Sequence, residues 1–305
     1  YLSFSFVDAK SWLQFDYAGN VLQEASYAAL QSLADGRKIV TPGFYGVLPD
    51  GRVHTFPRGG SDITGSLAAA ALHADVYENW TDVPGILAAD PKIVKRPAPI
   101  ETLSYPELQL LSAAGTQVLH ESAVAPVRER QIPLHIRSTF APDAPGTRIG
   151  FDAPASLSAS GVIGFAGRRP VSMLRIVFPE RAEDTALAAV CTCLRAHHMT
   201  LFHVSCGTED LCILLETGTE PNALHAAADQ LREHFSGAKV KLRENLAVLL
   251  TLCRSTKDIP KLSAAIEASG APVHHLVQTP PGAMFCVNDS QYEQALRAAY
   301  GAAFA

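Results

Sequence analysis

The chain has 305 residues, of which 48% are hydrophobic and 18% are charged. At roughly 150 residues per domain this length predicts two domains, and the apolar fraction excludes a disordered or low-complexity protein. The longest apolar run, near Leu246 to Cys253, is much shorter than the roughly 18 to 20 residues of a membrane-spanning helix. We therefore expect a soluble globular protein with no membrane partner.

Charge and cysteine content bear on partners and compartment. The net charge is −5 and the pI is about 6.1, which argues against a nucleic-acid surface or a basic membrane-binding helix. The six cysteines all lie in the second half. They are too sparse for a disulfide scaffold, and no signal peptide is expected. We expect reduced thiols and a cytoplasmic location.

The first half alternates short apolar runs with helical stretches. Helices are predicted at Leu22 to Leu33, Ile63 to Leu72 and Tyr105 to Leu111. This alternation predicts an α/β sheet, in which ligands usually bind beyond the carboxyl ends of the strands. A segment rich in Ala, Ser, Pro and Gly, from Ala153 to Gly161, predicts a domain boundary.

The second half contains a repeat of about 75 residues. The expected elements are strands at Val171 to Phe178, Met199 to Ser205, Leu211 to Glu216, Leu246 to Cys253, Val273 to Val277 and Met284 to Asn288, with helices at Asp184 to His197, Asn222 to Phe235, Ile259 to Ser269 and Ser290 to Tyr300. They form two βαββαβ units of ferredoxin-like type. The second unit lacks a last strand, and we expect it to borrow one, with Lys239 to Leu242 as the candidate.

The segment Arg58-Gly59-Gly60-Ser61-Asp62 carries the most informative chemistry. The two glycines allow close approach of the backbone, and Ser61 or Asp62 can cap the following helix. Arg58 can hold a carboxylate, free N–H groups attract an anion, and Asp62 can accept from an ammonium group. This combination suits a zwitterionic amino acid. A capped helix with a surface ion pair explains the same pattern.

A second candidate follows a short strand, where Thr81 and Asp82 could hold a nucleotide or magnesium. An ordinary turn is the alternative. Cys191 and Cys193 do not predict a metal site, because residues two apart on a helix point about 200° away from each other. Cys191 falls on the predicted apolar face of its helix, so buried thiols are expected and no metal ligands are assigned.

Together these motifs resemble the aspartokinases of the amino acid kinase family. The motifs that carry the resemblance are Ile39-Val40-Thr41-Pro42-Gly43-Phe44, Arg58-Gly59-Gly60-Ser61-Asp62, Trp80-Thr81-Asp82-Val83-Pro84-Gly85-Ile86, Asp90-Pro91, Leu103-Ser104-Tyr105, Gly115-Thr116-Gln117-Val118-Leu119-His120, Ile132-Pro133-Leu134 and Gly146-Thr147. They occur in the family's order, and the tandem βαββαβ units resemble the paired ACT regulatory domains of that family.

The resemblance implies a fold, a domain division and a reaction. Residues 1–150 would be the later part of the amino acid kinase α/β sandwich, 151–168 a linker, 169–243 the first ACT-like unit and 244–305 the second. The reaction would be transfer of the γ-phosphoryl group of ATP, with Mg2+, to the side-chain carboxylate of L-aspartate. The product, 4-phospho-L-aspartate, enters the biosynthesis of lysine, diaminopimelate, threonine and methionine.

Residue roles follow from the same resemblance. Arg58, Gly59, Gly60 and Ser61 would bind aspartate, and Asp62 would bind its ammonium group and organise the catalytic centre. The ATP-binding residues would be Thr81, Asp82, Leu87, Lys92, Gln117 and Val118. Three of these depart from a common family pattern, because Leu87 replaces a Tyr, Lys92 an Arg and Gln117 a Lys.

The family's opening strand and its Lys-Phe-Gly-Gly loop are not found in the sequence, so we expect these 305 residues alone to be inactive. The ACT-like units would bind an amino-acid effector, lysine or threonine, and form a homodimer. Two other interpretations remain open: a non-catalytic ACT effector-binding regulatory subunit, and a kinase for another amino acid.

Overall fold

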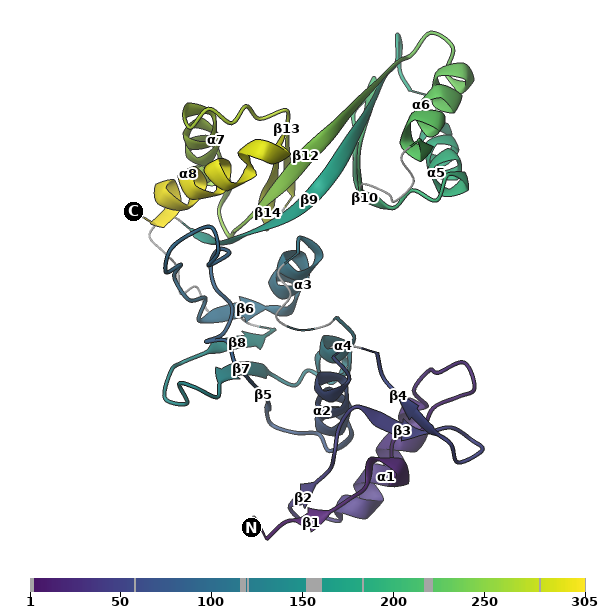
Figure 1. The fold of residues 1–305 in the computed structure, drawn as a ribbon, viewed down its shortest axis with the longest axis vertical. Helices are drawn as coiled ribbons and strands as arrows, with labels where there is room; N and C mark the ends of the chain where they lie inside the picture. Colours follow the sequence, from purple (N-terminus) through teal and green to yellow (C-terminus); the bar gives the residue numbers. More distant parts are fainter. Residues whose placement is uncertain are drawn as a thin grey trace. The chain divides into compact units, whose positions relative to one another are not determined.

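The computed structural model describes residues 3–57, 59–115, 119, 121–151, 161–182, 184–216, 222–279 and 281–304. These residues pack into two compact units, which are described separately (Figure 1). The first holds residues 3–88 and 97–151, and the second holds residues 89–96 and 161–304. Both combine sheets with helices, which confirms the predicted α/β class. Among the described helices, none combines the length and apolar character needed to cross a bilayer.

The first unit is built around a four-stranded sheet with the order β5-β7-β8-β6. The strands are β5 (Tyr77–Thr81), β6 (Thr102–Ser104), β7 (Leu134–Ser138) and β8 (Thr147–Gly150), and the helices are α1 (Gln23–Ala34), α2 (Gly60–Ala71), α3 (Tyr105–Ala113) and α4 (Glu121–Glu129). The strand pairs β5–β7 and β6–β8 are parallel, whereas β7 and β8 are antiparallel. Because β5 and β7 are parallel, their carboxyl ends meet at one edge of the sheet.

Smaller elements complete this unit. They are β1 (Ser5–Phe6) paired with β2 (Ile39–Val40), the short helix η1 (Ala9–Ser11), and the hairpin of β3 (Tyr45–Val47) and β4 (Val53–Thr55). Trp12, Phe15 and Leu30 are fully buried in the core that α1 and α2 share. The three helices predicted in this half are confirmed as α1, α2 and α3, and α3 begins with a capping box of Ser104 and Glu107, a motif that satisfies two otherwise unpaired amides.

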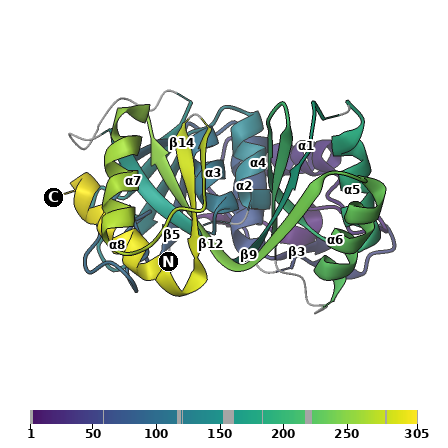
Figure 2. The same ribbon diagram turned by 90° about the horizontal axis from the view of Figure 1, so that it is seen from above.

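The second unit has one six-stranded sheet with the order β10-β11-β9-β12-β14-β13. Its strands are β9 (Val162–Val177), β10 (Leu201–Cys206), β11 (Asp210–Glu216), β12 (Lys239–Cys253), β13 (His275–Thr279) and β14 (Gly282–Asn288), its helices are α5 (Ala186–Ala196), α6 (Ala223–His234), α7 (Ile259–Ala268) and α8 (Tyr292–Phe304), and its short helices are η2 (Thr256–Asp258) and η3 (Asp289–Gln291). The helix pairs α5–α6 and α7–α8 lie at opposite ends of β9 and β12 (Figure 2).

Two long strands are shared by two ferredoxin-like halves. β9 has 16 residues and β12 has 15, and they pair along both ends. In one half, Lys239 to Arg243 of β12 pair with the later part of β9 as the last strand. In the other half, the start of β9 pairs with Val248 to Cys253 of β12 and supplies the last strand. The second half therefore borrows its last strand, as predicted, but that strand is the start of β9 and not Lys239 to Leu242, which completes the first half.

This arrangement corrects the predicted boundaries. Residues 162–168, assigned to a linker, are strand, and the predicted limit between residues 243 and 244 lies inside β12. Gly167 of this segment is needed for packing, since a Cβ there would lie 1.7 Å from the hydroxyl of Tyr292. Residues 152–160 of the predicted linker lie outside the described residues.

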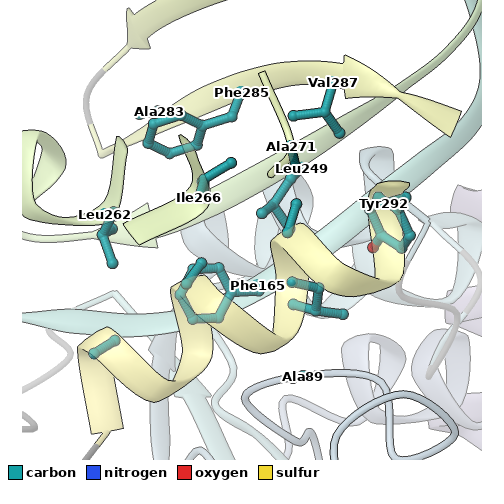
Figure 3. Packing of buried hydrophobic residues seen from close by; sticks show 14 of the residues in the cluster. Ala89, Phe165, Leu249, Leu262, Ile266, Ala271, Ala283, Phe285, Val287 and Tyr292 are labelled. Atoms are coloured by element: carbon teal, nitrogen blue, oxygen red, sulfur yellow. The ribbon is translucent and has the colours of Figure 1, made fainter. Parts of the chain in front are cut away.

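Apolar packing holds each half together. Phe165, Leu249 and Phe285 are buried against α7 and α8, together with Ala89 (Figure 3). A separate cluster buries one face of the sheet, where burial raises the pKa of Cys212 to about 11 and that of Cys286 to about 12. The predicted apolar face of α5 is right at Val190 and Leu194, which are buried, and wrong at Cys191, which is exposed while Cys193 is buried.

Candidate active site

The glycine segment forms the start of helix α2. Gly59 adopts a left-handed conformation (φ 84°) as the N-cap, and the helix begins at Gly60. A Cβ on Gly60 would lie 2.5 Å from the Cβ of Phe56 and 2.7 Å from the ring of Phe44. Each glycine is therefore required for a different reason, one for its dihedral angle and the other for space. The predicted side-chain cap by Ser61 or Asp62 is wrong, because both residues lie within the first turn and Gly59 is the cap.

The loop before α2 is tied to the helix by Thr64. Its hydroxyl donates to the carbonyl of Gly60 (2.8 Å) and accepts from the amide of Phe44 (3.0 Å). A Cβ on Gly43 would lie 3.1 Å from the Cα of Ser61, so this loop lies directly against the first turn. Within the described residues, the first two amides of α2 donate no hydrogen bond, which leaves them available to an anion.

Asp62 is held in place by strand β5. The side-chain nitrogen Nδ2 of Asn79 donates to Asp62 Oδ1 (2.9 Å), and the hydroxyl of Tyr77 donates to the backbone carbonyl of Asp62 (3.1 Å). Asn79 is 8% exposed, and burial raises the pKa of the Tyr77 hydroxyl, which keeps it protonated and able to donate. Among the described residues no hydrogen bond reaches Asp62 Oδ2, so this oxygen can accept from a ligand.

Thr81 and Asp82 stand at the carboxyl end of the same strand. The Thr81 hydroxyl donates to Asp82 Oδ1 (3.2 Å), and the Thr81 carbonyl accepts from the amide of Thr139 (2.8 Å). Asp82 is exposed. Because side chains alternate along a strand, Tyr77, Asn79 and Thr81 share one face. Thr81 thus lies two residues, or roughly 7 Å, beyond the side chain that holds Asp62.

On the other face of the sheet, Glu78 and Trp80 of β5 contact an arginine of β7 that the sequence analysis did not single out. Arg137 on β7 stacks on the ring of Trp80 at 4.3 Å and donates to Glu78 Oε1 (3.0 Å). Burial alone would raise the pKa of Glu78, but hydrogen bonds from Arg137 and Trp80 lower it. The Arg137 Nε is buried without a partner among the described residues. This cluster fixes the strand end that presents Thr81.

The turn after β5 is anchored by a buried threonine. Thr147 Oγ1 accepts from the amide of Ile86 (2.8 Å) and donates to the carbonyl of Ile100 (2.6 Å). Gly85 has φ 119°, and a Cβ there would lie 2.7 Å from the same hydroxyl. Leu87 follows, half-buried, in an isolated bridge with Pro99. The turn that holds Leu87, a predicted ATP residue, is therefore tied to the sheet by Thr147 and by the bridge to Pro99.

Known proteins with similar sequences and structures identify the family. The model of the amino acid kinase family matches residues 2–138. Aspartokinase 3 of Bacillus subtilis is 31% identical over 287 residues, which cover 88% of this chain and 60% of that protein. The crystal structure of Clostridium acetobutylicum aspartate kinase is 30% identical, has a TM-score of 0.87, and is matched over 98% of this chain and 71% of its own. The chain belongs to the aspartokinase family.

Two structures of Escherichia coli aspartokinase III share the fold. The complex with aspartate and ADP is 22% identical, with a TM-score of 0.73 over 99% of this chain and 70% of its own. The complex with lysine and aspartate is 23% identical, with a TM-score of 0.72. The chain spans 60% of the length of the Bacillus aspartokinase.

The predicted site residues fall into three groups. Gly59, Gly60, Ser61 and Asp62 lie at the start of α2, and Asp62 contacts β5, the strand that ends at Thr81 and is followed by Asp82 and Leu87. Lys92 belongs to the second unit, where its amide donates to Asp90 Oδ1 (2.8 Å). Arg58, Gln117 and Val118 lie outside the described residues. The roles of all these residues stay predictions.

Sequence reasoning missed Tyr77 and Asn79. The signal was present in the alternation of Tyr77-Glu78-Asn79-Trp80-Thr81, which puts the first, third and fifth residues on one face of a strand. A polar residue in the middle of a buried face needs a partner. That the partner is Asp62, 17 positions away in the sequence, depends on how α2 packs against β5.

Proposed function

We propose that the protein is an aspartate kinase, which transfers the γ-phosphoryl group of ATP to the side-chain carboxylate of L-aspartate and produces 4-phospho-L-aspartate. Family membership supports this activity, as does the E. coli aspartokinase III structure with aspartate and ADP. The observation that carries the proposal is the hydrogen bond from Asn79 to Asp62. It joins the predicted aspartate site to the strand that ends at the predicted ATP residues.

The aspartate site uses two kinds of group. The Oδ2 of Asp62, which has no hydrogen bond from the described residues, would accept from the ammonium group of aspartate. The amides of Gly60 and Ser61, which donate to no described residue, would bind a carboxylate. Arg58 would hold a carboxylate as well. The acceptor carboxylate is already ionised at neutral pH, so it needs no general base. Asp62 therefore acts by orienting the substrate, and catalysis is alignment and neutralisation of charge.

ATP would lie beyond the carboxyl end of β5. The Thr81 hydroxyl and the exposed Asp82 carboxylate offer the oxygen ligands that Mg2+ prefers. Leu87, Gln117 and Val118 are the other proposed ATP contacts of the first unit. Mg2+, when bound with the nucleotide, neutralises phosphate charge. The protein's own residues position the acceptor and hold the strand end in place.

Calorimetry with L-aspartate tests the substrate site. We expect saturable one-to-one binding by the wild-type protein. In Asp62→Asn the affinity for aspartate should fall at least about tenfold, because a charge-assisted hydrogen bond to the ammonium group is lost. Asp50→Asn is the matched control. That carboxylate is bonded to Arg52 in the β3–β4 turn, so its loss should leave the affinity unchanged. Equal affinities for the wild-type protein and Asp62→Asn would contradict the proposed role of Asp62.

The second unit would be regulatory. Its two ferredoxin-like halves support an interpretation as paired ACT domains, which would bind lysine or threonine and form a homodimer in the cytoplasm. The E. coli aspartokinase III complex with lysine provides the precedent. Calorimetry with lysine, threonine and methionine tests effector binding, and sedimentation tests the dimer. No heat from any of the three in folded protein would contradict the effector proposal.

A non-catalytic regulatory subunit is the alternative. The glycine segment and the Asp62–Asn79 contact in the first unit favour the enzyme, because an effector-binding subunit has no use for them. Absence of aspartate binding to folded protein, together with lysine or threonine binding, would favour the alternative instead.

A further inference from the structure

A basic pocket lies along the first part of β12, and all its residues belong to the second unit. Its volume is about 750 Å3, within the range of roughly 300 to 1,000 Å3 that is typical of small-molecule sites. Met173, Arg175, His225, Arg232, Val240 to Glu244, Val273 and His274 line it. Four of these are permanent cations, Arg175, Arg232, Lys241 and Arg243, whereas Glu244 is the single acid among the lining residues.

Two of the cations face each other across the sheet. β9 and β12 are antiparallel, and Lys241 is the direct cross-strand partner of Arg175. Arg243 lies two residues further along β12, on the same face as Lys241. Like charges directly opposite each other destabilise a sheet. An anion bound between them would remove this repulsion.

Acids pair with two of the four cations. Asp210 pairs with Arg175 (2.8 Å) and Asp229 with Arg232, whereas the lining acid Glu244 pairs with His225 (3.0 Å). Within the described residues, no ion pair reaches Lys241 or Arg243. Lys241 is exposed, so its ammonium group is free to meet a ligand.

Arg243 has a neutral partner instead of a carboxylate. It donates to Nδ1 of His274, whose Nε2 lies 2.8 Å from Oδ1 of Asn288. A ring that accepts at Nδ1 and donates at Nε2 is the neutral tautomer. This contact orients the Arg243 guanidinium toward the pocket and leaves its positive charge uncompensated.

We propose that this pocket binds a small organic anion with at least two oxyanion groups, phosphates or carboxylates. An arginine such as Arg243 can pair with either a phosphate or a carboxylate through two parallel hydrogen bonds, and Lys241 adds a point charge. With a net charge of −5 for the whole chain, the positive potential is local to the pocket. An amino-acid zwitterion is a poorer fit, because the one lining carboxylate, Glu244, is already bonded to His225.

Calorimetry at low ionic strength tests the pocket, with inorganic pyrophosphate and citrate as separate probes and no ATP or aspartate present. We expect saturable one-to-one binding of at least one probe. Lys241→Gln and Arg243→Gln should each weaken it about tenfold, the effect of losing one charge-assisted hydrogen bond. Lys261→Gln is the matched control, since Lys261 is an exposed residue of α7 outside the pocket.

The two probes distinguish the chemical source of the anion. Pyrophosphate binding alone would assign a phosphorylated ligand, citrate binding alone a polycarboxylate, and each supports the proposal. Failure of both probes to bind, or the same affinity in wild type, Lys241→Gln and Arg243→Gln, would overturn it. Pyrophosphate that bound only at the ATP site would give equal affinities in all three proteins, because neither substitution lies at that site. Because substrates are absent, neither result bears on the kinase activity.

Thermal unfolding shows that the variants are folded. Removing Lys241 relieves repulsion with Arg175, so Lys241→Gln without ligand should be no less stable than the wild type. The probe that binds should raise the Tm of the wild type and of Lys261→Gln and have little effect on Lys241→Gln. A rise of equal size in all three proteins would count against the pocket.

Discussion

The two units of the molecule are stabilised in different ways. Among the described residues nine polar side chains are buried, and seven of them are in the first unit, where Thr64, Asn79 and Thr147 tie loops to helices and strands. The second unit buries only Ser172 and Thr251. It relies on apolar packing around two long strands. Loops that end at helices and strands are fixed by directional bonds, whereas two halves that share long strands are held by a continuous sheet.

The shared strands make the second unit sensitive to added volume. Gly167→Ala puts a Cβ within 1.7 Å of the Tyr292 hydroxyl, and we expect the free energy of unfolding to fall by about 3 kcal/mol. Gly301→Ala in α8 is the matched control, since nothing lies within 4 Å of its added Cβ. That change should raise the free energy of unfolding by about 0.5 to 1 kcal/mol. Urea denaturation of both variants measures the contrast, and equal effects would mean that Gly167 is not a packing constraint.

The first unit should be sensitive to the loss of a single hydrogen bond. Asn79→Ala leaves Asp62 Oδ1 without its donor, so we expect a loss of about 2 kcal/mol in unfolding free energy and weaker aspartate binding. Thr251→Val in the second unit is the contrasting change, because the buried Thr251 hydroxyl has no partner among the described residues. Its loss should be neutral or stabilising. Chemical denaturation together with calorimetry decides this, and a destabilised Thr251→Val would remove the contrast.

Alkaline pH should weaken the second unit more than the first. Burial raises the pKa of Cys212 from 9.0 to about 11 and that of Cys286 to about 12. Between pH 9 and these values the unfolded thiols lose their protons while the folded thiols keep them, so stability falls as pH rises. The fall is at most about 1.4 kcal/mol per pH unit for each thiol.

Urea denaturation at pH 8 and pH 10 measures this effect. Cys286→Ala should reduce the pH dependence, leaving the part due to Cys212. Cys191→Ala, a change at an exposed thiol, should leave it unchanged. At pH 8 only the exposed Cys191 and Cys206 should react readily with iodoacetamide. Rapid alkylation of Cys212 or Cys286 in native protein would contradict the assigned burial.

Much of the fold could be predicted from local patterns. Helices α1, α2 and α3 follow from apolar periodicity, and the start of α3 follows from Ser104 and Glu107, whereas α4 was not predicted. The glycine pair of the site was visible as well. Its cap was misassigned because Ser61 and Asp62 are good caps by type, while the position of the helix start depends on the left-handed conformation of Gly59.

The boundaries of the second unit could not be predicted in the same way. The start of β9 has the small residues of a linker, and Arg243-Glu244-Asn245 has the polarity of a turn. In the structure the first is a strand packed against Tyr292, and the second is an irregularity inside a continuous strand, with Asn245 at φ 54°. The composition of a segment does not show whether another strand lies beside it, and here the pairing of β9 with β12 makes both segments part of a sheet.

The sequence by itself determined the α/β class, the positions of all the described α-helices but α4, and the glycine pair before α2, because periodicity and residue type act over a few neighbouring positions. Tertiary structure alone decided that Asn79 holds Asp62, that β9 completes the opposite half, and that Lys241 faces Arg175. Each of these joins residues far apart in the chain, and such contacts depend on packing and strand register.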